Sequence, residues 1–205
     1  MQSVMAEDCY SSPARRVVGN AGVVSDLPRR WDPTTSVRRD LNDSVYHGDK
    51  WDDRHWMNVP GPVYTAQTDT CWTGRTHAPR NVLYGGEYCN EFVYRQPKSP
   101  AEVECLLEAA DADPFDGYAC DGDSRWTPAA VRAWWSGRDK VYEHLAQLLA
   151  EYTREGANPS EVEAAAGVRD FLTYLATDLE TDLREYVFRL ENDRYPTADD
   201  PLPNL

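Results

Sequence analysis

The chain contains 205 residues, of which 41% are hydrophobic, 11% aromatic and 27% charged, and its formal net charge is −14. These are globular values, so the composition excludes a disordered acidic chain, and the lack of any run of about 18 apolar residues excludes a membrane-spanning helix. The first residues contain no apolar signal-peptide segment, and a cytoplasmic location is therefore expected.

The acidic excess is confined to the second half of the chain. Residues 1–98 contain 12 acidic and 12 basic residues, whereas residues 99–205 contain 23 acidic and 9 basic residues, a difference of −14. Such a field would repel the phosphates of DNA and RNA, so nucleic-acid binding is not expected. It would attract a basic protein partner, and the alternative is that the charge only keeps the protein soluble.

The five cysteines are scattered and odd in number, a pattern typical of reduced thiols. No two of them form a Cys-x-x-Cys pair. Iron–sulfur and structural zinc motifs place at least two ligands within a few residues, so no iron–sulfur cluster is expected.

The pattern of apolar, proline and glycine residues divides the chain into three parts. Residues 1–30 lack an apolar period and are expected to form a flexible N-terminal arm. Residues 31–195 are expected to form one α+β domain, with a loop and sheet half over 31–98 and a helical half over 99–195. Residues 196–205, which contain three prolines, are expected to form an irregular tail.

The loop and sheet half is rich in tryptophan and predicts a small antiparallel sheet. Residues 63–67 alternate as a short strand would, and they follow a turn over 58–62. Residues 81–84 and 87–95 then predict a hairpin, with Gly85-Gly86 as a two-residue turn.

Three helices are predicted in the second half. Ser99 and Thr127, each followed by a proline, are typical helix N-caps for the first two. Ser160 with Glu163 predicts a capping box for the third, whose apolar period continues to about Leu190. The loop between the last two helices is short, so they are expected to pack as a long antiparallel hairpin.

The outer face of the last predicted helix is the expected binding surface for a basic partner. Acidic residues recur along the solvent side of the apolar period. The candidate binding residues on this face are Asp178, Asp182 and Glu185.

A cluster of histidines and aspartates precedes the sheet. Imidazole and carboxylate groups at short separations can hold a divalent metal. The candidate ligands are His47, Asp49, Asp52 and His55. The alternative is a loop in which Trp51 and Trp56 are core anchors and the carboxylates pair with neighbouring basic residues.

A second polar segment spans residues 68–77. Cys71 and His77 have the ingredients of a thiolate nucleophile and its base, although catalytic partners are usually remote in sequence. The alternative is a hydrogen-bonded polar loop that binds a small polar ligand. Trp72 and Arg75 in this segment, together with Trp51 and Trp56, are further candidate binding residues, because aromatic side chains often provide binding hot spots.

Two hypotheses for function follow. The first is an acidic cytoplasmic interaction module that binds a basic protein partner, as an immunity or regulatory protein does. The second is a small enzyme with its site between Tyr46 and His77, which would use either a His/Asp-bound metal or Cys71.

Overall fold

The structure is a computed structural model, and it describes residues 50–205. The N-terminal arm predicted over 1–30 lies outside the described residues, as do the candidate metal ligands His47 and Asp49. Among residues 50–205, no helix is both long enough and apolar enough to cross a membrane.

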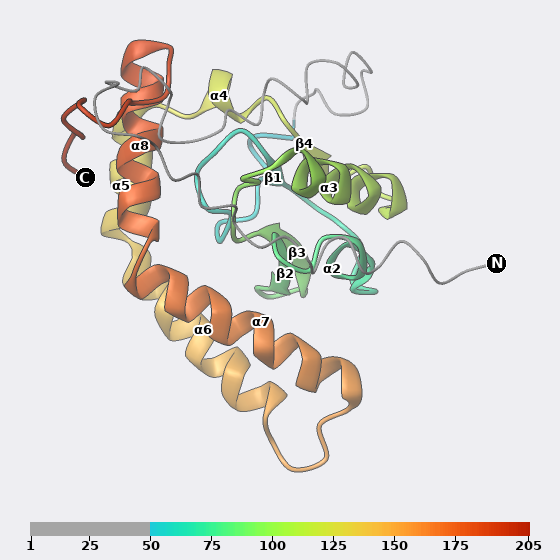
Figure 1. The fold of residues 1–205 in the computed structure, drawn as a ribbon. Helices are drawn as coiled ribbons and strands as arrows, with labels where there is room; N and C mark the ends of the chain where they lie inside the picture. The colour runs from blue at the N-terminus through green and yellow to red at the C-terminus, as the bar shows by residue number, and fades with distance from the viewer. Residues whose placement is uncertain (1–49) are drawn as a thin grey trace, which may run out of the picture.

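The fold is α+β, as predicted, with its strands in two small antiparallel pairs (Figure 1). β1 (Tyr64–Thr65) pairs with β4 (Tyr118–Ala119), and β2 (Val82–Gly85) pairs with β3 (Asn90–Val93). The predicted hairpin is present, but its loop is longer than two residues. Gly85 pairs with Asn90, so the loop is Gly86–Cys89, which Gly86 enters with a positive φ of 77°.

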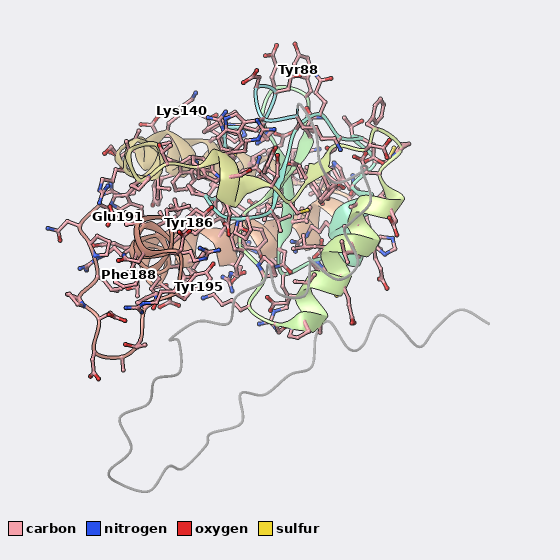
Figure 2. All side chains as sticks on the ribbon, turned by 90° about the horizontal axis from the view of Figure 1, so that it is seen from above. Tyr88, Lys140, Tyr186, Phe188, Glu191 and Tyr195 are labelled. Carbon is pink, nitrogen blue, oxygen red and sulfur yellow. The ribbon has the colours of Figure 1, made fainter. Side chains whose placement is uncertain are left out.

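The tip of this hairpin projects from the surface. Tyr88 is highly exposed and lies at the edge of the molecule in Figure 2. Behind the tip, the Gly85 backbone packs against Leu148, so close that an added Cβ would lie 3.0 Å from Leu148 Cδ1. The β2–β3 hairpin is therefore seated on the helix that carries Leu148.

The first two predicted helices begin at the positions that the N-cap and proline residues predict. α3 (Pro100–Ala112) begins after Ser99, whose side chain accepts a hydrogen bond from Glu102 N. α5 (Pro128–Ser136) begins after Thr127, which accepts one from Ala130 N. Two short helices, α2 (Thr73–His77) and α4 (Gly122–Arg125), were not predicted.

The long hairpin is present, and each of its two arms is broken once. The first arm consists of α5 and α6 (Arg138–Tyr152), separated at Gly137. The second consists of α7 (Pro159–Ala176) and α8 (Leu179–Asn192), separated at residues 177–178. α6 lies antiparallel to α7 and α5 lies against α8, and the two pairs run in different directions (Figure 1).

The capping box of the third helix was predicted at the wrong residues. The box is formed by Asn158 and Glu161: the Asn158 side chain accepts from Glu161 N, and Glu161 Oε2 accepts from Asn158 N. Pro159 then occupies the first helical position, which its fixed φ favours. Glu163 is instead engaged by Arg75, whose Nη2 lies 2.7 Å from its Oε1.

The prediction that Asp182 and Glu185 lie on an exposed face of the last helix is wrong. They are only 9% and 8% exposed, whereas Asp178 is exposed. Asp182 accepts a hydrogen bond from the Tyr174 hydroxyl and forms an ion pair with Lys98, whose Nζ lies 2.7 Å from Asp182 Oδ2. The prediction assumed that only the apolar side of the last helix is buried, as the apolar period indicates. In the structure, α8 also buries polar residues on other sides of the helix.

Two further expectations concern the cysteines and the tail. Cys71, Cys89 and Cys120 are free thiols, but Cys105 is disulfide-bonded, so the prediction of reduced thiols is wrong for Cys105. Residues 196–205 contain no helix or strand. Arg184 donates hydrogen bonds to backbone carbonyls of this segment, which therefore lies against α8.

Candidate functional site

His55, one of the predicted metal ligands, has both ring nitrogens engaged. Its Nδ1 accepts from Met57 N at 3.2 Å, so Nε2 carries the proton and donates to Gly85 O at 3.2 Å. Among residues 50–205, no three His, Cys, Asp or Glu side chains form a group that could hold a metal ion. Asp52 is exposed, and the described part of the predicted set does not form a site by itself.

Two histidines instead hold the two ends of the Gly85-Gly86 corner. His55 donates to Gly85 O, and His144 Nε2 accepts from Gly86 N at 2.9 Å. Burial lowers the pKa of His55 to about 4 and also lowers the pKa of His144. Both imidazoles are therefore neutral near pH 7, which is the form that this arrangement requires.

The 68–77 segment is held by three buried carboxylates. Asp113 accepts from Asp69 N at 3.0 Å, and Asp69 in turn accepts from Cys71 N at 3.0 Å. Glu91 on β3 accepts from Gly74 N at 2.6 Å and from the Tyr118 hydroxyl at 2.6 Å. The segment is thus a hydrogen-bonded polar loop whose supports come from distant parts of the chain.

Burial perturbs the pKa of the Glu91 carboxyl group. Its side chain is fully buried, and burial raises its pKa from 4.5 to about 7. The bonds from Tyr118 and Gly74 oppose this shift, while the nearby charges of Asp69 and Asp113 add to it. Near pH 7 Glu91 is therefore divided between its neutral and ionised forms.

A cavity of about 460 Å³ lies between this loop and the N-terminus of α7, and Cys71, Trp72, Arg75 and Ser160 are among its lining residues. Trp72 has a positive φ of 67°, which is unfavourable for a non-glycine residue, and its ring stacks on Tyr84 with centroids 3.9 Å apart.

The predicted catalytic pair is not gathered in this cavity. Cys71 is exposed and lines it, but His77 is not among the lining residues. His77 Nδ1 lies 3.6 Å from Glu108 Oε2 on α3 instead.

Arg75, a predicted binding residue, has most of its donors engaged within the protein. Its Nε and Nη2 donate to the two oxygens of Glu163, and its Nη1 donates to Pro79 O and Val82 O. It packs directly against the α7 backbone at Gly167, where an added Cβ would lie 2.5 Å from Arg75 Nη1. Its role in the described structure is to join α2 and β2 to α7.

The predicted aromatic binding residues before the sheet lie in different surroundings. Trp51 is half-buried and makes edge contacts with Tyr64 and Trp126, as a core anchor would. Trp56 is 36% exposed, and Lys140 Nζ lies 4.4 Å from the centre of its ring. Figure 2 shows Lys140 at the outer surface.

Sequence reasoning missed an acidic surface on α3. Residues 99–124 contain eight acidic residues and no Lys or Arg. Glu104, Glu108 and Asp111 are spaced by four and three residues and are exposed on one side of α3. Phe115, 66% exposed, and the exposed Asp116 follow in the next turn. We call these five residues the acidic α3 surface. The spacing of its carboxylates by four and three residues is the signal by which the sequence could have indicated it.

No protein-family model, no curated protein and no solved structure matches the chain.

Proposed function

We propose that this protein is an acidic interaction module that binds a basic protein partner, in the manner of an immunity or regulatory protein. The observation that carries the proposal is the acidic α3 surface, in which three carboxylates line one helix face beside an exposed aromatic ring. Carboxylates on one face attract a cationic partner and raise its association rate.

Within residues 50–205, no Lys or Arg forms an ion pair with Glu104 or Glu108 of this surface. Residues 99–124 provide no basic side chain, and the neighbouring α2 provides His77, 3.6 Å from Glu108 and uncharged unless protonated. Arg80 lies 3.9 Å from Glu102, which stands beside the surface rather than in it. A basic partner would therefore meet two carboxylates, Glu104 and Glu108, that no Lys or Arg of residues 50–205 engages.

Phe115 adds an apolar contact to the charged one. An exposed aromatic ring among charged groups is typical of a binding hot spot, because its burial supplies affinity that salt does not screen. The turn that carries it is held by hydrogen bonds: Asp113 accepts from Phe115 N at 3.3 Å and from Gly117 N at 2.7 Å. Such a preformed surface loses little conformational entropy on binding.

The test separates a specific surface from general acidity. An amphipathic helical peptide with lysines on one face and leucines on the other is the probe, and its affinity is measured by fluorescence anisotropy at low and high salt. The triple variant Glu104→Gln, Glu108→Gln, Asp111→Asn should weaken binding about 10-fold or more at low salt. Phe115→Ser should weaken it at both salt concentrations.

The matched control removes the same charge from another helix. The residues chosen, Asp139, Glu143 and Glu151, are exposed on α6. Their replacement by Asn, Gln and Gln makes the net charge less negative by the same amount as the α3 triple variant does. This variant should bind the peptide within about 2-fold of the natural chain. If both triple variants weaken binding equally, the peptide senses only net charge, and the proposal of an α3 surface fails.

The enzyme hypothesis keeps one supporting observation, which is that the exposed Cys71 thiol lines the 460 Å³ cavity beside α7. An activated thiolate would react with iodoacetamide well below the pH at which an ordinary thiol does. The alkylation rate of Cys71 against pH, with Cys71→Ser as the blank, decides the matter. An ordinary thiol profile eliminates the cysteine form. The metal form of the hypothesis is tested by metal analysis of the purified protein. It is eliminated if the protein contains less than about 0.1 equivalent of bound transition metal and His55→Gln contains the same amount.

A further inference from the structure

A second cavity, of about 390 Å³, lies between the loop around His55 and helix α5. Three tryptophans, Trp56, Trp126 and Trp134, are among its walls. His55 and Arg54 line it from the loop, and Ala130 and Ala133 leave it open on the side of α5. We call it the tryptophan cavity.

Most polar groups around the tryptophan cavity are already paired. Asn58 donates from Nδ2 to His55 O and Thr65 O, and its Oδ1 accepts from Thr65 N and Val93 N. The two ring nitrogens of His55 are engaged with backbone groups. Trp134 Nε1 donates to Trp56 O at 3.2 Å. None of these groups is left to hold a ligand.

Trp126 is the exception. The residue is only 6% exposed, and its Nε1–H is buried without a hydrogen-bond partner among residues 50–205. Its position is fixed from both sides, because its backbone N donates to Gly122 O at 2.8 Å and its ring meets the edge of Trp51 at 5.0 Å. A buried donor costs free energy when unpaired, so an acceptor from outside the chain would be favoured at this place.

A cation lies over the Trp51 ring and near the Trp126 ring. The Arg54 guanidinium carbon lies 4.1 Å from the centre of the Trp51 ring and 5.4 Å from that of Trp126. Arg54 Nη1 donates to Trp51 O at 3.0 Å, and this is the one hydrogen bond from its side chain within residues 50–205. The remaining N–H groups of this guanidinium are available to an anion.

We propose that the tryptophan cavity binds a small planar carboxylate, an aromatic monocarboxylic acid of one or two rings. The polar groups left to a ligand are a donor and a cation, which together select a carboxylate over a cation or a neutral ring. The indole walls select a flat apolar body, and the volume lies at the lower end of ordinary ligand pockets. Trp126 Nε1 and Arg54 hold the carboxylate, while the ring of the ligand packs against Trp56 and Trp134.

The test uses three probes that share one ring: indole-3-acetate, indole and tryptamine. Calorimetric titration of the full chain should show indole-3-acetate binding about 10-fold or more tighter than either of the others. In the NMR spectrum, the indole N–H resonance that is missing from Trp126→Phe should move on addition of indole-3-acetate and stay in place with tryptamine. This comparison of ligands needs no variant that might fold differently.

Variants then assign the contacts. Trp126→Phe keeps a ring but removes the donor, and Arg54→Met keeps the side-chain stem but removes the charge; each should weaken indole-3-acetate about 5-fold or more. Ala130→Leu should block the cavity, while Ala129→Leu, on the exposed side of the same helix, should not. The proposal is overturned if indole-3-acetate at about 1 mM does not bind, if tryptamine binds equally well, or if Arg54→Met leaves its affinity unchanged.

Discussion

Replacing Glu91 by glutamine should remove the loss of stability that rising pH causes through the ionisation of this residue. Glu91 is fully buried and accepts hydrogen bonds from Gly74 N and the Tyr118 hydroxyl. Glutamine has nearly the same shape, can accept from Gly74 N through its oxygen and carries no charge at any pH. The substitution removes the ionisation of this site, and at Tyr118 it replaces the acceptor oxygen by an amide N–H that can donate to the hydroxyl oxygen. This second change does not depend on pH.

The magnitude follows from the pKa of Glu91. Because the folded-state pKa is raised from 4.5 to about 7, the unfolded chain ionises first, and the stability conferred by the neutral carboxyl is lost as the pH rises through this interval. The full loss is about 3 kcal/mol above pH 7, at 1.36 kcal/mol for each pH unit between the two pKa values. Between about pH 5 and about pH 8.5, some 2.5 kcal/mol of it should appear.

Urea unfolding of both proteins across this pH range measures the effect, and the difference between them at each pH is the useful quantity. The contributions of His55 and His144, which oppose that of Glu91 on the acid side, cancel in this difference. Glu180→Gln, on the exposed side of α8, is the control and should show no such trend. If Glu91→Gln and the natural chain lose stability in parallel as the pH rises, the assignment of a raised pKa to Glu91 is wrong.

Three further substitutions test how the fold is held. Gly122→Ala should cost about 1–3 kcal/mol in the free energy of unfolding, because its Cβ would lie 2.1 Å from Gly61 O; equal melting temperatures would contradict this. Arg75→Met should cost about 2 kcal/mol in urea, less than for a fully buried ion pair because Glu163 is half exposed. His144→Gln should reduce the stability lost on acidification below about pH 6.5, since the lowered pKa of His144 makes its protonation unfavourable in the fold; an unchanged pH profile in urea would refute it.

Helix starts were predictable because their chemistry is local. Ser99 and Thr127 are each followed directly by proline and cap the helices that the sequence indicates. The breaks at Gly137 and at residues 177–178 were not predicted, because the apolar period continues across them and only packing on neighbouring helices decides where an arm bends. Local chemistry does not decide the cap of the third predicted helix either, because Ser160 with Glu163 and Asn158 with Glu161 have the same spacing and only the structure shows that Asn158 forms the box.

The supports of the candidate sites could not be predicted, because they join residues remote in sequence. Asp69 N donates to Asp113, 44 residues away, and the Tyr118 hydroxyl donates to Glu91 over a separation of 27. The unpaired Nε1–H of Trp126 depends on the three-dimensional position of every potential acceptor around it. Sequence spacing indicates which groups are present in a segment, whereas the fold decides which are already paired.

The pairing of carboxylates with basic groups also determines which acidic surface can attract a partner. Several carboxylates of the second half are engaged by basic groups: Lys98 pairs with Asp182, and Arg189 with Asp123. A formal charge therefore overstates the field around α8, where a partner surface was first expected. α3 lies on the far side of the strands from α8 (Figure 1), in a segment with no Lys or Arg. If a basic partner binds this protein, the exposed carboxylates of Glu104 and Glu108 on α3 should direct it there, and removal of charge from α8 should leave its association rate almost unchanged.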